Sequence, residues 1–164
     1  VVELDSLGPE VLALWERCAH KWEASAVRDA DFLRWRFMEH PQRSYSVLAC
    51  RAADGTLAGL CVVGLDELHS KGARALADWL VPLESSEVAI SLERAAVARA
   101  KASGGERLVA SLPPWSDDFK LFQELSWRVQ STPYSLCARS FERRIDLDLL
   151  GRGWWLTFAD GDLA

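Results

Sequence analysis

The sequence predicts an α/β protein of the three-layer α+β type, in which helices pack on a central sheet. The first observation is a hairpin signal: apolar runs at 45–51 and 56–65 flank a turn containing Asp54-Gly55, a pair that tolerates positive φ. The second is the stretch 75–112, where an apolar strand, a long amphipathic helix and another apolar run form a βαβ unit. The third is the element order, because helical patterns precede the hairpin and follow the βαβ unit.

Composition narrows the classes of function. The chain has 164 residues, enough for one domain over 1–164 with a real core, and 49% of them are hydrophobic. Its net charge of -5 argues against a nucleic-acid partner, since such proteins present a basic face. The absence of a long apolar run and of a signal pattern predicts a cytoplasmic protein with no membrane partner. The start at Val1 instead of Met suggests a domain cut from a longer chain.

Two helices are predicted before the hairpin. Residues 7–24 carry an apolar stripe at helical spacing, and residues 28–39 form a shorter helix that Pro41 ends. Five arginines alternate with aromatic residues in this part of the chain: Arg28, Arg34, Arg36, Arg43 and Arg51. Acidic neighbours offset them, so we interpret them as a packed helix surface whose arginine stems cover tryptophan.

The βαβ unit is the centre of the predicted fold. Its first strand ends at Pro82, which cannot donate to a sheet ladder. Ser85 or Ser86 is the expected N-cap of the helix, and Gly104 supplies the left-handed exit. Open α/β sheets bind ligands beyond the carboxyl ends of such strands, so we expect a binding site first at residues 81–88.

Three elements are predicted after this unit. Ser116 caps a helix whose first turn holds Asp117 and Asp118, which suit the positive end of the helix dipole. Residues 134–141 predict a further strand, and residues 154–158 predict an edge piece.

Several short motifs, taken with this element order, resemble the GCN5-related N-acetyltransferase (GNAT) superfamily. Residues 33–37, Leu-Arg-Trp-Arg-Phe, followed by His40-Pro41, are similar to the "WRY, then HP" stretch of a bacterial GNAT subfamily. Residues 155–157, Trp-Leu-Thr, followed by Asp-Gly-Asp at 160–162, are similar to the tail of that subfamily. The resemblance implies a mixed, mostly antiparallel sheet flanked by helices, with the βαβ unit as the acyl-CoA motif.

The same resemblance implies acetyl-CoA or another acyl-CoA as co-substrate. In GNAT enzymes the strand of this motif pairs with the pantetheine arm, and amides at the following helix N-terminus bind the pyrophosphate. Carried onto this chain, the resemblance places the cofactor on Trp79, Leu80, Val81, Leu83, Ser85, Ser86, Glu87 and Val88. Backbone donors and the helix dipole favour an anion there without demanding particular side chains.

The chain departs from the GNAT pattern at two places. The usual Gln/Arg-x-x-Gly-x-Gly/Ala loop is absent, and Glu84 and Glu87 bring negative charge to the pyrophosphate position. These carboxylates are either ordinary helix-stabilising residues or the mark of a pocket that has decayed or been re-used. In the family motif Tyr-x-x-x-Gly-Phe the phenol protonates the departing thiolate; here Phe122 stands at the tyrosine and Ser126 at the glycine, which removes that acid. Tyr134 is a possible substitute in space.

A general base is still available. Asp78 lies on the central strand, where alternation puts it either in the active cleft or on a solvated face, and Glu67 ends the second strand of the hairpin. His40 and His69 are further candidates, although a lone histidine is more often a loop or capping residue.

No metal site is predicted. The cysteines are widely spaced in apolar settings, which favours free buried thiols: Cys18, Cys50, Cys61 and Cys137. Asp160-Gly-Asp162 lacks the other ligands of a calcium loop and is interpreted as a solvated tail.

Two functions remain. The first is an acyl-CoA-dependent N-acyltransferase acting on a small amine, an amino sugar or a peptide, with Asp78 as the base and Glu67 second. The second is a catalytically degenerate GNAT-like domain that serves as a binding or structural module. Such a module would act with a partner domain or a second copy of the chain, and an exposed tryptophan patch would mark its interface.

Overall fold

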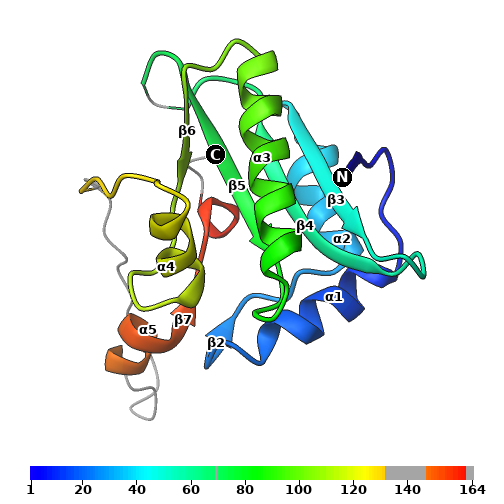
Figure 1. Cartoon of the computed structure of the whole chain (residues 1–164), viewed down its shortest axis with the longest axis vertical. Helices are drawn as coiled ribbons and strands as arrows, with labels where there is room; N and C mark the ends of the chain where they lie inside the picture. Colours follow the sequence, from blue (N-terminus) through cyan, green and yellow to red (C-terminus); the bar gives the residue numbers. More distant parts are fainter. Residues whose placement is uncertain (69, 132–146, 162–164) are drawn as a thin grey trace.

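A five-stranded sheet runs through the computed structural model, which describes residues 1–68, 70–131 and 147–161 (Figure 1). Its strand order is β1-β3-β4-β5-β6, and its members are β1 (Val2–Glu3), β3 (Tyr45–Arg51), β4 (Leu57–Gly64), β5 (Ala73–Leu80) and β6 (Arg107–Ala110). Neighbouring strands are antiparallel except β5 and β6, which are parallel. The mixed, mostly antiparallel sheet is therefore present as predicted.

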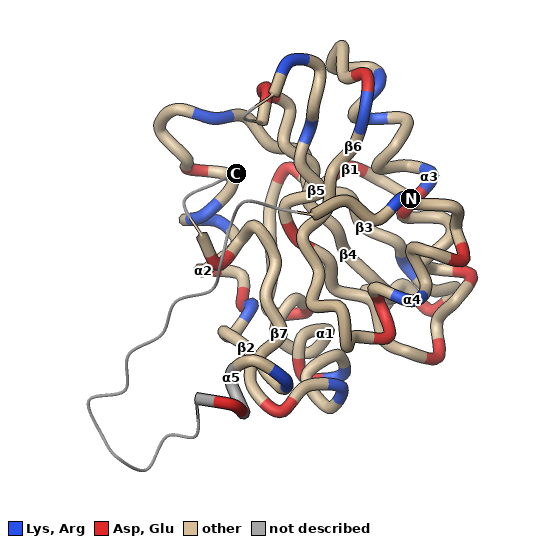
Figure 2. Tube along the Cα trace, turned by 90° about the vertical axis from the view of Figure 1, so that its left-hand side faces the viewer, with Lys and Arg blue, Asp and Glu red and all other residues tan. Residues whose placement is uncertain are grey.

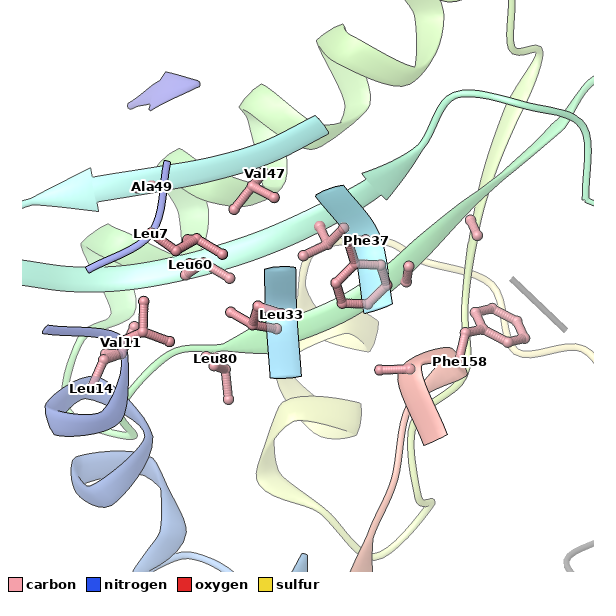
Figure 3. Packing of buried hydrophobic residues seen from close by; sticks show 14 of the residues in the cluster. Leu7, Val11, Leu14, Leu33, Phe37, Val47, Ala49, Leu60, Leu80 and Phe158 are labelled. Atoms are coloured by element: carbon pink, nitrogen blue, oxygen red, sulfur yellow. The ribbon is translucent and has the colours of Figure 1, made fainter. Parts of the chain in front are cut away.

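Helices cover both faces of this sheet and bury two apolar clusters. One face carries α1 (Glu10–Ala19), α2 (Ala30–Leu33) and the π-helical turn η1 (Arg34–Met38), and Figure 3 shows their side chains packed against the strands. The other face carries α3 (Ser86–Ala102) and α4 (Asp117–Glu124). The apolar stripe of α3 faces the strands through Ala89, Leu92, Ala96 and Ala100, as its spacing predicts.

The C-terminal segment returns to the first of these faces. It comprises α5 (Leu147–Gly153), β7 (Trp154–Trp155) and the 3₁₀ turn η2 (Phe158–Asp160). β7 pairs in parallel with β2 (Ala24–Ser25), and Figure 2 shows these two strands side by side near α1. The Trp155 indole stacks on Trp22 with ring centroids 4.0 Å apart.

Most predicted elements are confirmed, with four differences. The first helix ends at Ala19, not 24, because Lys21 and Trp22 are drawn into tertiary contacts. The second predicted helix is a four-residue α-helix continued by a π-helical turn. The edge piece predicted at 154–158 is a strand only at Trp154–Trp155, and it joins β2 in a separate two-stranded sheet. Three elements were not predicted, namely β1, β2 and α5, and the strand predicted at 134–141 lies outside the described residues.

A β-bulge interrupts the pairing of β4 with β5. Val62 pairs with Asp78 and Val63 with Leu76, so Ala77 is an extra residue on β5. The bulge shifts the alternation of side chains by one residue. Ala77 packs in the cluster beneath α1 and α2, and Asp78 joins it on that face instead of pointing towards α3.

Candidate functional site

A cleft of about 220 Å³ opens where β5 ends, between the start of α3 and α4. Its walls come from the β5–α3 turn and from one face of α4, and they are formed by Val81, Pro82, Leu83, Ser85, Ser86, Ala89, Asp117, Asp118, Lys120, Leu121 and Glu124. The position matches the one expected from the βαβ pattern, beyond the carboxyl end of the strand.

The sheet topology creates this cleft. β6 pairs with β5 only from Ala73 to Leu76, so among the described residues the second half of β5 has a strand neighbour on the β4 side alone. α4 fills part of the space that a longer β6 would occupy. Phe122 of α4 packs edge-on against Trp79 of β5, with ring centroids 5.0 Å apart.

The first turn of α3 faces the cleft without a side-chain cap. Ser85 is the N-cap residue, as predicted, but its hydroxyl forms no capping hydrogen bond. The helix is 17 residues long, so its N-terminus carries unpaired N–H groups and the positive end of a full helix dipole. Glu84 and Glu87 are exposed beside it, and they oppose the attraction of this helix end for an anion.

The structure divides the predicted cofactor-binding residues. Four of them line the cleft: Val81, Leu83, Ser85 and Ser86. Trp79 and Leu80 lie in the core beneath the cleft, 1% and 0% exposed, so only their backbone could face a ligand. Glu87 and Val88 follow in the first turn of α3 but do not line the cleft.

A buried ion pair between Lys21 and Asp118 lies behind one wall of the cleft, and Asp118 is its member on that wall. Lys21 Nζ lies 3.0 and 3.1 Å from the two carboxylate oxygens of Asp118 and 2.7 Å from the carbonyl oxygen of Val81, to which it donates. The two side chains are only 5% and 6% exposed. Lys21 thus ties the first turn of α4 to the residue that follows β5, and it helps to set the width of the cleft.

The surroundings of Asp118 act on the pKa of its carboxyl in opposite directions. Burial raises the pKa of its carboxyl, and the Lys21 ammonium acts in the opposite direction. The indole N–H groups of Trp79 and Trp155 also favour its ionised form, although neither makes a hydrogen bond of ordinary geometry. Burial raises the pKa of the neighbouring Cys18 thiol to about 12.

Asp78 occupies neither of the two positions that alternation allowed, since it is 0% exposed and does not line the cleft. One carboxylate oxygen accepts from Arg28 Nε at 3.0 Å, and the other accepts from the Thr157 hydroxyl at 2.8 Å. Burial raises its pKa, and the Arg28 guanidinium offsets part of that shift. In this conformation a substrate could reach Asp78 only after Thr157 and Arg28 moved aside, and its role as a base stays a prediction.

Glu67 and Asp78 are not brought together. Glu67 is exposed in the loop before β5, where it accepts from the Gly72 N–H at 3.0 Å. Asp78 lies six residues beyond Gly72, which corresponds to roughly 20 Å along a strand. His40 has the capping role that a lone histidine most often has, because its Nδ1 accepts from the N–H groups of Gln42 and Arg43. His69 and Tyr134 lie outside the described residues.

The arginine interpretation needs a correction. Arg28 and Arg36 are buried, not spread over a helix surface, and both hold the C-terminal segment. Arg28 Nη2 lies 2.6 Å from Asp160, and Arg36 donates to the carbonyl oxygens of Ala159 and Gly161. Asp160 is exposed, as a tail residue would be, but its side chain is only 17% exposed because it pairs with Arg28. The residues that resemble the GNAT tail are structural partners of those that resemble its "WRY" stretch.

The proposed alignment of α4 with the GNAT tyrosine motif gains one independent observation. Ser126 has φ +69°, the left-handed conformation for which glycine is the usual residue. Its neighbours form the matching helix end, since the Trp127 N–H donates to Phe122 O at 2.9 Å and the Ser126 N–H to Gln123 O at 3.0 Å. Phe122 itself is 3% exposed and offers no acid.

Sequence reasoning missed the contribution of Lys21 and Asp118. Asp118 was interpreted only as a helix-dipole partner, and Lys21 fell within a predicted helix. A usable signal was the pair of adjacent aspartates at the start of α4, because only one of them is needed to favour the helix dipole. Asp117 is exposed and pairs with Lys120, whereas Asp118 turns inward.

Two absences among the described residues bear on function. No group of three or more histidine, cysteine or acidic side chains gathers there in a way that could hold a metal ion. No helix within the described ranges is long and apolar enough to cross a membrane. Charges of both signs are interspersed along the chain in the view of Figure 2. Cys18 and Cys61 are buried free thiols and Cys50 is partly buried.

The architecture has a counterpart among solved structures. A GCN5-related N-acetyltransferase from Kribbella flavida superimposes with a TM-score of 0.53, at 17% sequence identity, over 71% of this chain and 74% of that chain. No protein-family model matches the sequence, and no curated protein sequence matches it significantly. The mixed, mostly antiparallel sheet flanked by helices is therefore the fold of GCN5-related N-acetyltransferases.

Proposed function

We propose that this chain is an acyl-CoA-dependent N-acyltransferase that moves an acetyl or other acyl group to an amine. The observation that carries the proposal is the cleft at the carboxyl end of β5, which faces the uncapped first turn of α3. The likeness of the fold to that of a solved GNAT enzyme also supports the proposal. In this reading Val81 and Leu83 border the acyl-pantetheine arm, and the α3 amides near Ser85 and Ser86 meet the pyrophosphate.

Around the cleft, the backbone of β5 and α3 suits acyl-CoA better than the surrounding side chains do. The half of β5 without a β6 partner offers main-chain groups to an extended arm, and the dipole of α3 favours an anion. Glu84 and Glu87 act against the anion, and Lys120, a basic residue of the cleft wall, is held by Asp117 at 2.9 Å. We therefore expect acyl-CoA binding that depends mainly on backbone donors and is weaker than a basic loop would give.

The chemistry would be direct attack of a bound amine on the thioester carbonyl carbon. The protein's contribution is to position both reactants and to polarise the carbonyl with strand amides. The acceptor is a small amine, an amino sugar or a peptide amine. Asp78 or Glu67 would serve as the base only after rearrangement, because the first is enclosed and the second lies at the far end of β5.

A second candidate is a binding or structural module without catalysis. Phe122 in place of the acidic tyrosine favours it, as do the glutamates at the start of α3. Trp35 is 66% exposed and provides an apolar contact point for a partner domain or a second copy.

Calorimetric and thermal-shift titration with acetyl-CoA separates the two readings. Saturation at about one hundred times the dissociation constant should stabilise the fold by roughly 2.7 kcal/mol. Release of CoA thiol with a panel of amines then tests turnover. No binding of acetyl-CoA or longer acyl-CoAs would overturn the enzyme, and binding without turnover would favour the module.

A matched pair of variants tests the location of the site. Ser86→Glu adds a negative charge at the start of α3, where it suits the helix dipole but repels a pyrophosphate. Ser91→Glu adds the same charge to an exposed position of the same helix outside the cleft. We expect weaker acetyl-CoA binding for Ser86→Glu and little change for Ser91→Glu; equal effects would place the site elsewhere.

A further inference from the structure

Asp118 stands out among the carboxylates because it is both buried and on the cleft wall. Its side chain is 6% exposed, yet it borders the cleft between α3 and α4. It lies one helical turn before Phe122, the residue that replaces the proton-donating tyrosine in the resemblance to GNAT enzymes. Both face the sheet side of α4, since residues four apart share a helix face.

The neighbours of Asp118 hold it in place and set its charge. Lys21 Nζ bridges both of its oxygens and is itself fixed to the Val81 carbonyl oxygen. The indole Nε1 atoms of Trp79 and Trp155 are buried without a hydrogen-bond partner and lie towards the same carboxyl group. A carboxyl whose two oxygens are held by one fixed ammonium, and which also borders the cleft, is oriented to exchange a proton in a defined direction.

A group that exchanges a proton near neutral pH needs a pKa that is neither very low nor very high. Burial raises the pKa of Asp118 above its ordinary value, whereas Lys21 and the two indoles lower it. The remaining titratable neighbour, Cys18, has its pKa raised by burial to about 12 and stays a thiol. Asp117 and Lys120 pair with each other at the exposed rim.

Resting on the acyl transfer proposed above, we propose that Asp118, held by Lys21, relays a proton from the attacking amine to the departing thiolate. The Asp118 carboxyl would thereby protonate the departing thiolate, as the missing tyrosine does in the resemblance, from a position one turn earlier on α4.

The step balances in atoms and charge. The neutral amine nitrogen attacks the thioester carbon, a C–N bond forms and the carbonyl π pair moves to oxygen. The Asp118 carboxylate accepts the proton that the new ammonium loses. The oxyanion re-forms the carbonyl, the C–S bond breaks with its electron pair on sulfur, and the protonated Asp118 delivers the proton to that thiolate. The products are an amide and CoA thiol, and Asp118 ends as the carboxylate.

The test is the kinetics of Asp118→Asn against the unchanged chain, with acetyl-CoA and an accepted amine. We expect kcat to fall by about 10²-fold or more while acetyl-CoA binding stays within a few fold. Asp118→Glu should recover part of kcat and shift the acidic limb of its pH profile, which a purely structural carboxylate would not do. Asp31→Asn is the matched control, because it removes an exposed aspartate from an ion pair far along the chain.

The neutral double variant Lys21→Gln/Asp118→Asn covers the case in which Asp118→Asn alone does not fold, since it leaves no unpaired buried charge. It should be folded by circular dichroism, bind acetyl-CoA and still be slow. Turnover within threefold of the unchanged chain in a folded variant overturns the relay and leaves the proposed enzyme standing. If the wild-type protein neither binds acyl-CoA nor turns it over, both the proton relay and the proposed N-acyltransferase function are overturned.

Discussion

Arg28 Nε lies 3.0 Å from a carboxylate oxygen of Asp78, and both side chains are fully enclosed although the residues are fifty positions apart. The same guanidinium reaches Asp160 through Nη2 and lies over the rings of Phe32 and Trp155. Arg28 therefore joins the segment before α2, the bulged strand β5 and the C-terminal turn in one buried contact.

This arrangement predicts a large loss of stability on truncation. Asp78→Ala leaves the Arg28 guanidinium and the Thr157 hydroxyl without their buried acceptor, which should cost about 3–5 kcal/mol of unfolding free energy. Urea unfolding followed by circular dichroism measures it. Asp31→Ala breaks an exposed pair with Arg34 and should cost less than about 1 kcal/mol. A similar cost for both variants would mean that the buried network contributes little.

Helix α3 approaches the sheet closely because Gly59 has no side chain. A Cβ there would lie 2.7 Å from Val88 Cγ1 and 2.9 Å from Leu92 Cδ1. Gly59→Ala should push the first turns of α3 outward and destabilise the fold by about 1–3 kcal/mol. Thermal unfolding tests this, with Gly151→Ala as the control because a Cβ at Gly151 meets nothing within 4 Å. Equal melting temperatures for the two variants would contradict the close packing.

The end of α4 contains a correctable strain. Ser126 adopts φ +69°, which costs an L-residue roughly 1–2 kcal/mol and glycine almost nothing. Ser126→Gly should therefore raise the unfolding free energy by about 1 kcal/mol. The same replacement at Ser91, an exposed position inside α3, should lower it by about 0.5–1 kcal/mol. Chemical denaturation distinguishes these opposite signs, and a loss at both positions would rule out the left-handed assignment.

The hairpin turn should show a pH-dependent contribution from Asp54. Its carboxylate accepts from the Thr56 N–H at 2.9 Å and the Thr56 hydroxyl at 2.7 Å, which holds its pKa below the ordinary 3.8. Because the folded pKa is the lower one, this stabilisation is present above pH 3.8 and is lost as the pH falls through the folded value. Asp54→Asn should melt earlier than the unchanged chain at pH 7, and the difference should vanish near the acid limit. A constant difference across the titration would show that the charge plays no part.

The sequence by itself determined the hairpin, the βαβ unit, the helix that follows this unit and the position of the cleft. Hydrophobic periodicity located the hairpin, the βαβ unit and α4, because it records which face of each element is buried. Pro82 and the serines after it marked the end of β5 and the start of α3. These are local properties of the chain, and they predicted a binding site at residues 81–88, where Val81, Leu83, Ser85 and Ser86 line the cleft.

Only the tertiary structure decided what the charged residues do. The bulge at Ala77 turned Asp78 towards Arg28, and no alternation pattern reveals a one-residue slip in pairing. The ion pairs of Arg28 with Asp160 and of Lys21 with Asp118 span 132 and 97 positions of sequence. Such pairs depend on how distant elements pack, so a sequence shows the charges but not their partners. The fold was thus set by local pattern, whereas the chemistry of the cleft was set by long-range contact.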